Sequence, residues 1–174
     1  KLSLKLSREE EELSPKQLLR SVMGRWLNTA DAVLSMAATH LPSPVVAQKY
    51  RTQQLYKGPQ EDQCAIAMRE CDPKGPLMVY VAKLFPSSEK GRFFAFARVF
   101  SGTVESGMRL RIMGSQYKPG FKQDLFEKCI QRVILWFSGK YECVPSVRCG
   151  NFVVLVGIDA YLTKTGTLSN CSEA

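Results

Sequence analysis

The spacing of apolar residues changes at about residue 77. Before this point, apolar side chains recur every three or four residues, which is the spacing of one face of an α-helix. After it, short runs rich in β-branched and aromatic residues are separated by glycine and proline, which is typical of antiparallel strands joined by turns. The chain of 174 residues is therefore predicted to be mainly β, with two or three helices followed by an antiparallel barrel or sandwich.

The helical part contains clear start and stop signals. Ser14 and Pro15 suit a helix cap followed by the first helical position, and Pro42 ends a second helical pattern. The predicted segments are a polar lead-in to about residue 12, helices at about 15–27, 30–41 and 44–50, a loop at 51–60 and a short helix at about 61–70.

The strand part predicts six main strands, at about 77–85, 92–102, 108–114, 129–137, 151–158 and 166–170. Phe96, Val99 and Ile112 are predicted to lie in the core. The phenylalanines at 93, 94, 96 and 100 stand beside cations, so they could also stack on unpaired bases, but burial in the core is favoured. Arg109 and Arg111 share one strand face, which indicates a solvated outer surface.

The charge is unevenly distributed. The chain has a net charge of +8, and residues 75–174 hold 13 Lys and Arg against 7 Asp and Glu, a net of +6. A basic second half suggests a polyanion such as nucleic acid as partner, while the same charge would also serve solubility alone. The two interpretations stay open at this point.

No catalytic, cofactor-binding or metal-ligating motif is recognisable. The sequence contains no phosphate loop, no dinucleotide-binding glycine pattern and no C-x-x-C pair, and His40 has no partner at ligand spacing. The six cysteines are predicted to be buried, reduced thiols rather than disulfides. Without an apolar run of 18 residues or a signal-peptide core, the chain is expected to be cytoplasmic and not membrane-bound.

Several motifs in order resemble the translation elongation factor 2 family of eukaryotes. They are HLPSP at 40–44, AQKYR at 47–51, CDPKGPLM at 71–78, KGRFFAFARVFSG at 90–102, RIMG at 111–114, IQR at 130–132 and KTGT at 164–167. The glycines and apolar residues from Gly91 to Gly114 also resemble the second domain of translational GTPases in general. Gly102 and Gly107 suit turns that need a positive φ.

The resemblance implies a division into residues 1–59, the last helices of a GTPase region with a linker, and 60–174, a β-barrel second domain. The whole factor would be a GTPase that uses GTP and Mg²⁺ to drive movement of tRNA and mRNA through the ribosome. This piece would carry neither ligand nor activity. As a monomer it would couple the adjoining GTPase domain to the rest of the factor and contact small-subunit ribosomal RNA.

Four basic residues in or beside turns are the candidates for that RNA contact: Lys90, Arg92, Lys118 and Lys122. Two alternatives remain. One is a structural, GTPase-like component of the spliceosome, whose family departs from the AQKYR motif. The other is a flavin-binding reductase barrel, although RVFSG at 98–102 puts Phe100 where its flavin motif has tyrosine.

Overall fold

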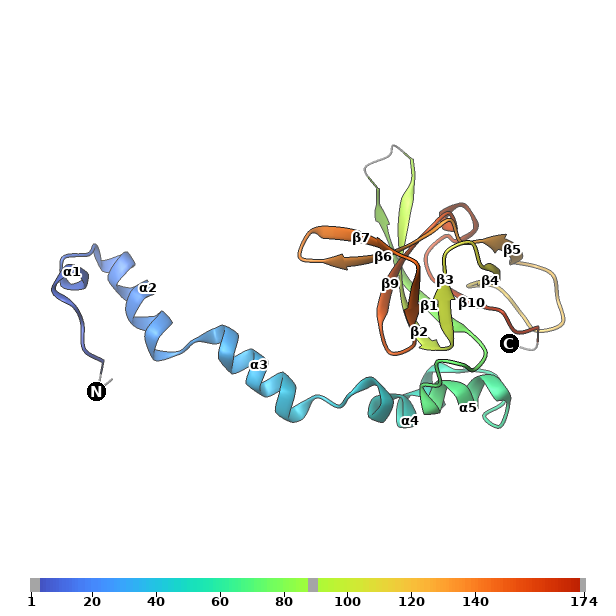
Figure 1. Ribbon diagram of the computed structural model, residues 1–174, viewed down its shortest axis with the longest axis horizontal. Helices are drawn as coiled ribbons and strands as arrows, with labels where there is room; N and C mark the ends of the chain where they lie inside the picture. The colour runs from blue at the N-terminus through green and yellow to red at the C-terminus, as the bar shows by residue number, and fades with distance from the viewer. Residues whose placement is uncertain (1–3, 88–90, 173–174) are drawn as a thin grey trace. The chain divides into compact units, whose positions relative to one another are not determined.

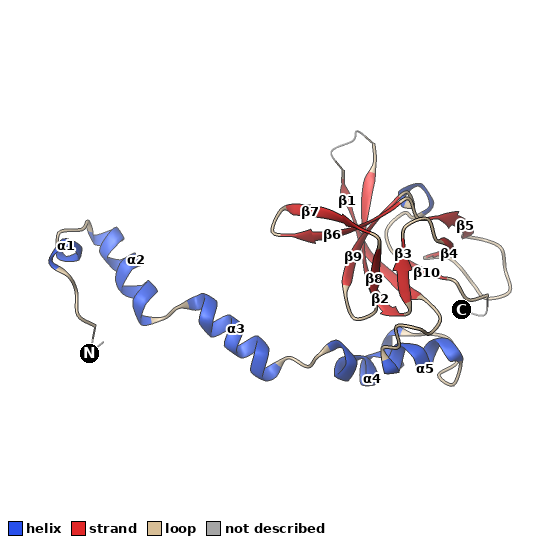
Figure 2. Cartoon of the chain, in the orientation of Figure 1, coloured by secondary structure: helices blue, strands red, loops and turns tan. Residues whose placement is uncertain are grey.

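The computed structural model describes residues 4–87 and 91–172, and it divides into two compact units, Lys1–Pro42 and Ser43–Ala174. The predicted order is confirmed: helices come first and an antiparallel sheet follows (Figure 2). The predicted division after residue 59 falls within the second unit. None of the helices in the described ranges has the length and hydropathy needed to cross a bilayer.

The first unit consists of three helices, α1 (Arg8–Glu11), α2 (Pro15–Trp26) and α3 (Thr29–His40). Pro15 occupies the first turn of α2, and the Asn28 side chain accepts the amide of Ala30 at the start of α3. No residue of these three helices is buried. The apolar side chains of α2 and α3 are therefore largely open, with Leu34 66% exposed.

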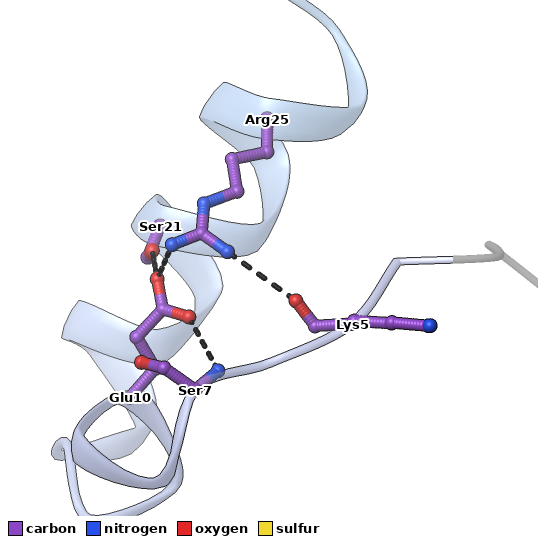
Figure 3. A network of polar contacts seen from close by, with 5 residues as sticks. All are labelled: Lys5, Ser7, Glu10, Ser21 and Arg25. Carbon is purple, nitrogen blue, oxygen red and sulfur yellow. Dashed lines mark hydrogen bonds and ion pairs between the residues drawn. The ribbon is translucent and has the colours of Figure 1, made fainter.

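One polar network joins α1 to α2 (Figure 3). The Glu10 carboxylate accepts hydrogen bonds from the Ser7 amide at 2.9 Å and the Ser21 hydroxyl at 2.8 Å, and it pairs with the Arg25 guanidinium. Arg25 also donates to the carbonyl of Lys5 at 3.4 Å. The amide of Ser7 first, then the Ser21 hydroxyl, lower the pKa of Glu10 from 4.5 to about 2, because they stabilise the charged form.

The second unit begins with α4 (Pro44–Leu55) and α5 (Gln63–Glu70). The buried Gln48 side chain donates to the carbonyls of Met68 and Phe100, which fastens α4 to α5 and to the sheet. The four segments predicted to be helical correspond to α2, α3, α4 and α5, while α1 lies in the predicted polar lead-in. With five α-helices in the described residues, the chain is mixed α/β, so the prediction of a mainly β chain with two or three helices was too low in helix. The loop predicted from residue 51 was also wrong as far as Leu55, because no helix-breaking residue interrupts the chain before Gly58.

Eight strands form one antiparallel sheet in the order β5-β4-β10-β1-β2-β9-β6-β7 (Figure 1). β3 pairs with β8 in a separate ladder (Figure 2). Their bounds are β1 (Met78–Pro86), β2 (Phe93–Ser101), β3 (Thr103–Glu105), β4 (Arg109–Gly114), β5 (Leu125–Cys129), β6 (Arg132–Phe137), β7 (Lys140–Val144), β8 (Ser146–Arg148), β9 (Phe152–Val156) and β10 (Gly166–Ser169), with a short 3-10 helix η1 (Asp159–Tyr161).

The predicted strand at 129–137 is two strands. The chain leaves β4 after Cys129 and joins β9 at Arg132. Between them, Ile130 is buried and its amide donates to the Met108 carbonyl at 3.0 Å. The sequence does not reveal this change of partner strand, because Ile130 is apolar and buried although it lies between two strands.

The main core lies on one face of the sheet. It includes Val79, Val99, Leu110, Ile112 and Leu168, each at most 2% exposed. Val99 and Ile112 confirm the prediction. Phe96 does not lie there and that prediction was wrong.

The alternation of β2 explains the error. Ala95, Ala97, Val99 and Ser101 point into the core, so the phenylalanines at 94, 96 and 100 lie on the opposite face, together with Arg98. That face carries a second, smaller cluster built on Ile134, Val154 and Val156. The sheet is therefore apolar on both faces along β2.

Gly102 needs to be a glycine for two reasons. Its φ is +73°, and an added Cβ would lie 2.7 Å from the Cα of Leu77. Gly107 also has a positive φ of +82°. Both turn predictions are confirmed, and the tight turn at Gly102 leads β2 directly into β3.

Candidate nucleic-acid interface

Arg92 precedes β2 and is held by a carboxylate. Its Nε and Nη2 atoms donate to the two oxygens of Asp159 at 3.0 and 3.1 Å, and the amide of Phe93 donates to the same carboxylate at 3.1 Å. Burial by itself would raise the pKa of Asp159, but the hydrogen bonds from Arg92 and Phe93 and the Arg92 charge together lower it. The carboxylate of Asp159 therefore balances much of the positive charge of Arg92.

Lys118 and Lys122 are exposed in the loop that joins β4 to β5. Asp124 orders this loop: its carbonyl accepts the amide of Gly114 at 2.9 Å and its carboxylate that of Gln116 at 2.9 Å. Within the described part of the chain, neither lysine forms an ion pair. The fourth candidate, Lys90, lies outside the described residues.

The register of the sheet puts Arg92 and this loop at the same end of the strands. Gly114, the last residue of β4, pairs with Gly166 at the start of β10, and β10 pairs with β1. β1 ends at Pro86, which pairs with Phe93, the residue after Arg92. Through Gly166, the end of β4 lies level with Val81, five residues before Pro86. Three of the four predicted residues therefore lie toward the same end of the strands, with Arg92 farther along than the loop.

A cluster of aromatic rings lies on the outer face, which is the face opposite the main core, and it was not predicted from the sequence. Its ring centroids lie 5.3–6.3 Å apart, and the rings of Phe96 and Phe152 are nearly parallel, at 11°. The members of this outer aromatic cluster are Phe85, Phe94, Phe96, Trp136, Tyr141 and Phe152. The alternation of large and small residues in FFAFARVF is the signal that could have revealed it.

Arg98 extends this cluster with a positive charge. Its guanidinium carbon lies 5.3 Å from the Phe100 ring centroid and 5.4 Å from that of Phe152. Its buried Nε has no hydrogen-bond partner among the described residues. Burial, and secondarily the charge of Arg51 on α4, lower the pKa of Arg98. Among the described residues, neither Arg98 nor Arg51 forms an ion pair with a carboxylate, and uncompensated positive charge favours the binding of an anion.

A groove of about 630 Å³ opens beside the cluster. The pairing of β6 with β9 stops at Ile134 opposite Val154, and the β6–β7 hairpin then extends away from β9 (Figure 1). The groove lies in the gap that this leaves. Side chains along it include Phe96, Trp136, Phe137, Arg148, Asn151 and Phe152.

The six thiols differ in their exposure. Cys129 and Cys143 are exposed, which contradicts the prediction of burial for those two. They lie on strands β5 and β7, the two ends of the eight-stranded order, where each strand has a neighbour in that sheet on one side only. Cys149 donates its thiol to the Cys71 carbonyl at 3.0 Å. Burial first, then its side-chain interaction with the Cys71 thiol, raise the pKa of Cys149 to about 12. In the described ranges, no three His, Cys, Asp or Glu side chains are placed to share a metal ion.

Comparison with models of known protein families finds no match for this chain. What the structure offers chemically is a basic end of the sheet and an aromatic, cationic groove. Both are suited to binding a polyanion.

Proposed function

We propose that this chain is part of a ribosome-dependent GTPase of the elongation factor 2 family, comprising the last helices of the GTPase region and the barrel domain after it. The observation that carries the proposal is the series of motifs in a fixed order from residue 40 to 167, above all KGRFFAFARVFSG at 90–102. The placement of that segment supports it: its described part forms the central strand β2 and the tight turn at Gly102.

The connection between β5 and β6 supports a curled, barrel-like sheet. β5 lies at one edge of the eight-stranded order and β6 next to the last strand of the other edge. Six strand spacings in a flat sheet would separate them by roughly 28 Å. The chain from Cys129 to Arg132 spans at most about 11 Å. The two edges must therefore approach one another, as they do in a barrel.

The exposed apolar faces of α2 and α3 support the proposal that an adjoining domain packs against them. The apolar side chains of α2 and α3, such as Leu19, Trp26 and Leu34, are more than half exposed. An isolated helix with such a face gains most of its stability from packing against other elements. We assign this face to the adjoining GTPase domain, which would bind GTP and Mg²⁺.

The RNA contact is assigned to the basic end of the sheet. Lys118 and Lys122 are its main contributors, because both are exposed on an ordered loop and neither is paired with a carboxylate in the described part of the chain. Arg92 contributes less, since Asp159 already holds it in a bidentate pair. Such lysines would bind the phosphates of small-subunit ribosomal RNA without reading its sequence.

The reading frame upstream of Lys1 tests the proposed parent. A GTPase region requires a phosphate loop, whose amides and lysine hold the nucleotide phosphates, and an N-K-x-D motif for the base. We expect both within the preceding reading frame. A frame that encodes a folded domain with neither motif would remove the GTPase assignment.

A further inference from the structure

The outer aromatic groove has the features of a binding site for unpaired bases. We propose that the groove between β9 and the β6–β7 hairpin binds single-stranded RNA, with bases stacked on Trp136 and Phe152 and phosphates placed near Arg98 and Arg148. This inference goes beyond the proposed function, because it rests on the groove alone and concerns a different surface from the basic loop at 115–124.

The rings are available for stacking. Trp136 is 41% exposed and Phe152 53% exposed, although each already contacts another ring of the cluster. Phe152 stacks on Phe96 with centroids 5.3 Å apart and nearly parallel planes. Such a pair is a rigid π surface that a base can extend, and it tolerates any base because every base has a π face.

The charges beside the rings favour a polyanion over an apolar peptide. Arg148 lines the groove and forms no ion pair in the described part of the chain. Arg98 lies over Phe152, and Lys83 lies 5.4 Å from the Phe85 ring at the other end of the cluster. None of the described residues that line the groove is a carboxylate. A purely apolar partner would leave these cations without counter-charges, which disfavours it.

The test is fluorescence anisotropy of the full chain with a labelled single-stranded RNA of mixed sequence and with the same RNA as a duplex. We expect the single strand to bind more tightly, because duplex bases are already stacked. Trp136→Leu and Phe152→Leu should each weaken binding at least about fivefold. Trp136→Phe keeps a ring and should stay within about twofold of the parent. Arg148→Gln should reduce the logarithmic salt slope by about 0.7.

Trp26→Leu is the matched control, because it makes the same exchange at an exposed tryptophan in the first unit. With Trp26 replaced by Phe, Trp136 is the remaining tryptophan of the sequence, and stacked bases should quench its emission. Equal affinity of parent, Trp136→Leu and Trp136→Phe, or equal binding of duplex and single strand, would overturn the proposal. If Trp136→Leu fails to fold, the salt dependence of binding by Arg148→Gln and the quenching of Trp136 emission by RNA test the proposal instead.

The two proposals can fail separately. If the groove does not bind single-stranded RNA, the proposed binding of Lys118 and Lys122 to ribosomal subunits is not affected. Conversely, a chain with no affinity for ribosomes could still bind free single strands through the groove.

Discussion

Replacing Ile112 by alanine tests the inward register of β4. Ile112 is fully buried and pairs with Leu168 of β10 on one side and Phe126 of β5 on the other. The exchange removes three carbon atoms, which corresponds to roughly 2.4 kcal/mol of transfer free energy at about 0.8 kcal/mol per methylene. The cavity left behind adds to this, so we expect a loss of about 3–4 kcal/mol in the free energy of unfolding.

Urea denaturation followed by circular dichroism measures this loss, and a thermal melt should show a fall of roughly 6–16 °C. Arg109→Ala on the same strand is the control, because its ion pair with Glu127 joins side chains that are 71% and 52% exposed. Such a surface pair contributes at most about 1 kcal/mol. Coincident unfolding curves for the two variants would mean that the register is shifted by one residue.

Two further predictions concern titratable groups. The Glu10 contacts should persist above pH 4.5 and be lost as the pH falls toward about 2, because the lowered pKa means that the charged form is the one stabilised. The Ser7 amide resonance in NMR should follow this transition, and Glu10→Gln should abolish it; a midpoint near 4.5 would contradict the network. At pH 8, Cys149 should react with iodoacetamide far more slowly than the exposed Cys129 and Cys143, because burial raises its pKa to about 12. Equal labelling rates in mass spectrometry would refute that.

The order of elements was predictable because the local signals agree with the fold. Caps and prolines mark the helices at Pro15 and Pro44, and both begin α-helices as expected. Alternation on β4 was equally clear, since its outward positions are arginines. In such segments, one face is polar and the other apolar, so the register has a single solution.

The site could not be predicted because β2 is apolar on both faces. When the residues on both faces of a strand are apolar, the larger side chains are the ones expected to be buried. Phe96 was therefore assigned to the core in preference to Ala95 and Ala97. In the structure, Ala95 and Ala97 face the main core and Phe96 faces the opposite side. The close packing of the core at this part of β2 accommodates the small alanine side chains. The positions of Phe152 beside Arg98 and of Trp136 beside Phe85 depend on strand pairing between distant segments, which no local pattern encodes.

Binding to purified small ribosomal subunits, measured across a range of salt concentrations, tests the central claim most directly. Each phosphate that is neutralised releases roughly 0.7–0.9 of a counterion, so Lys118→Ala/Lys122→Ala should flatten the logarithmic salt dependence by about 1.5 and weaken binding. Lys5→Ala/Lys16→Ala removes the same charge from the first unit and should leave the slope unchanged. If the Lys118/Lys122 variant retains both the slope and the affinity of the parent, the loop does not contact the subunit and the proposed docking is contradicted.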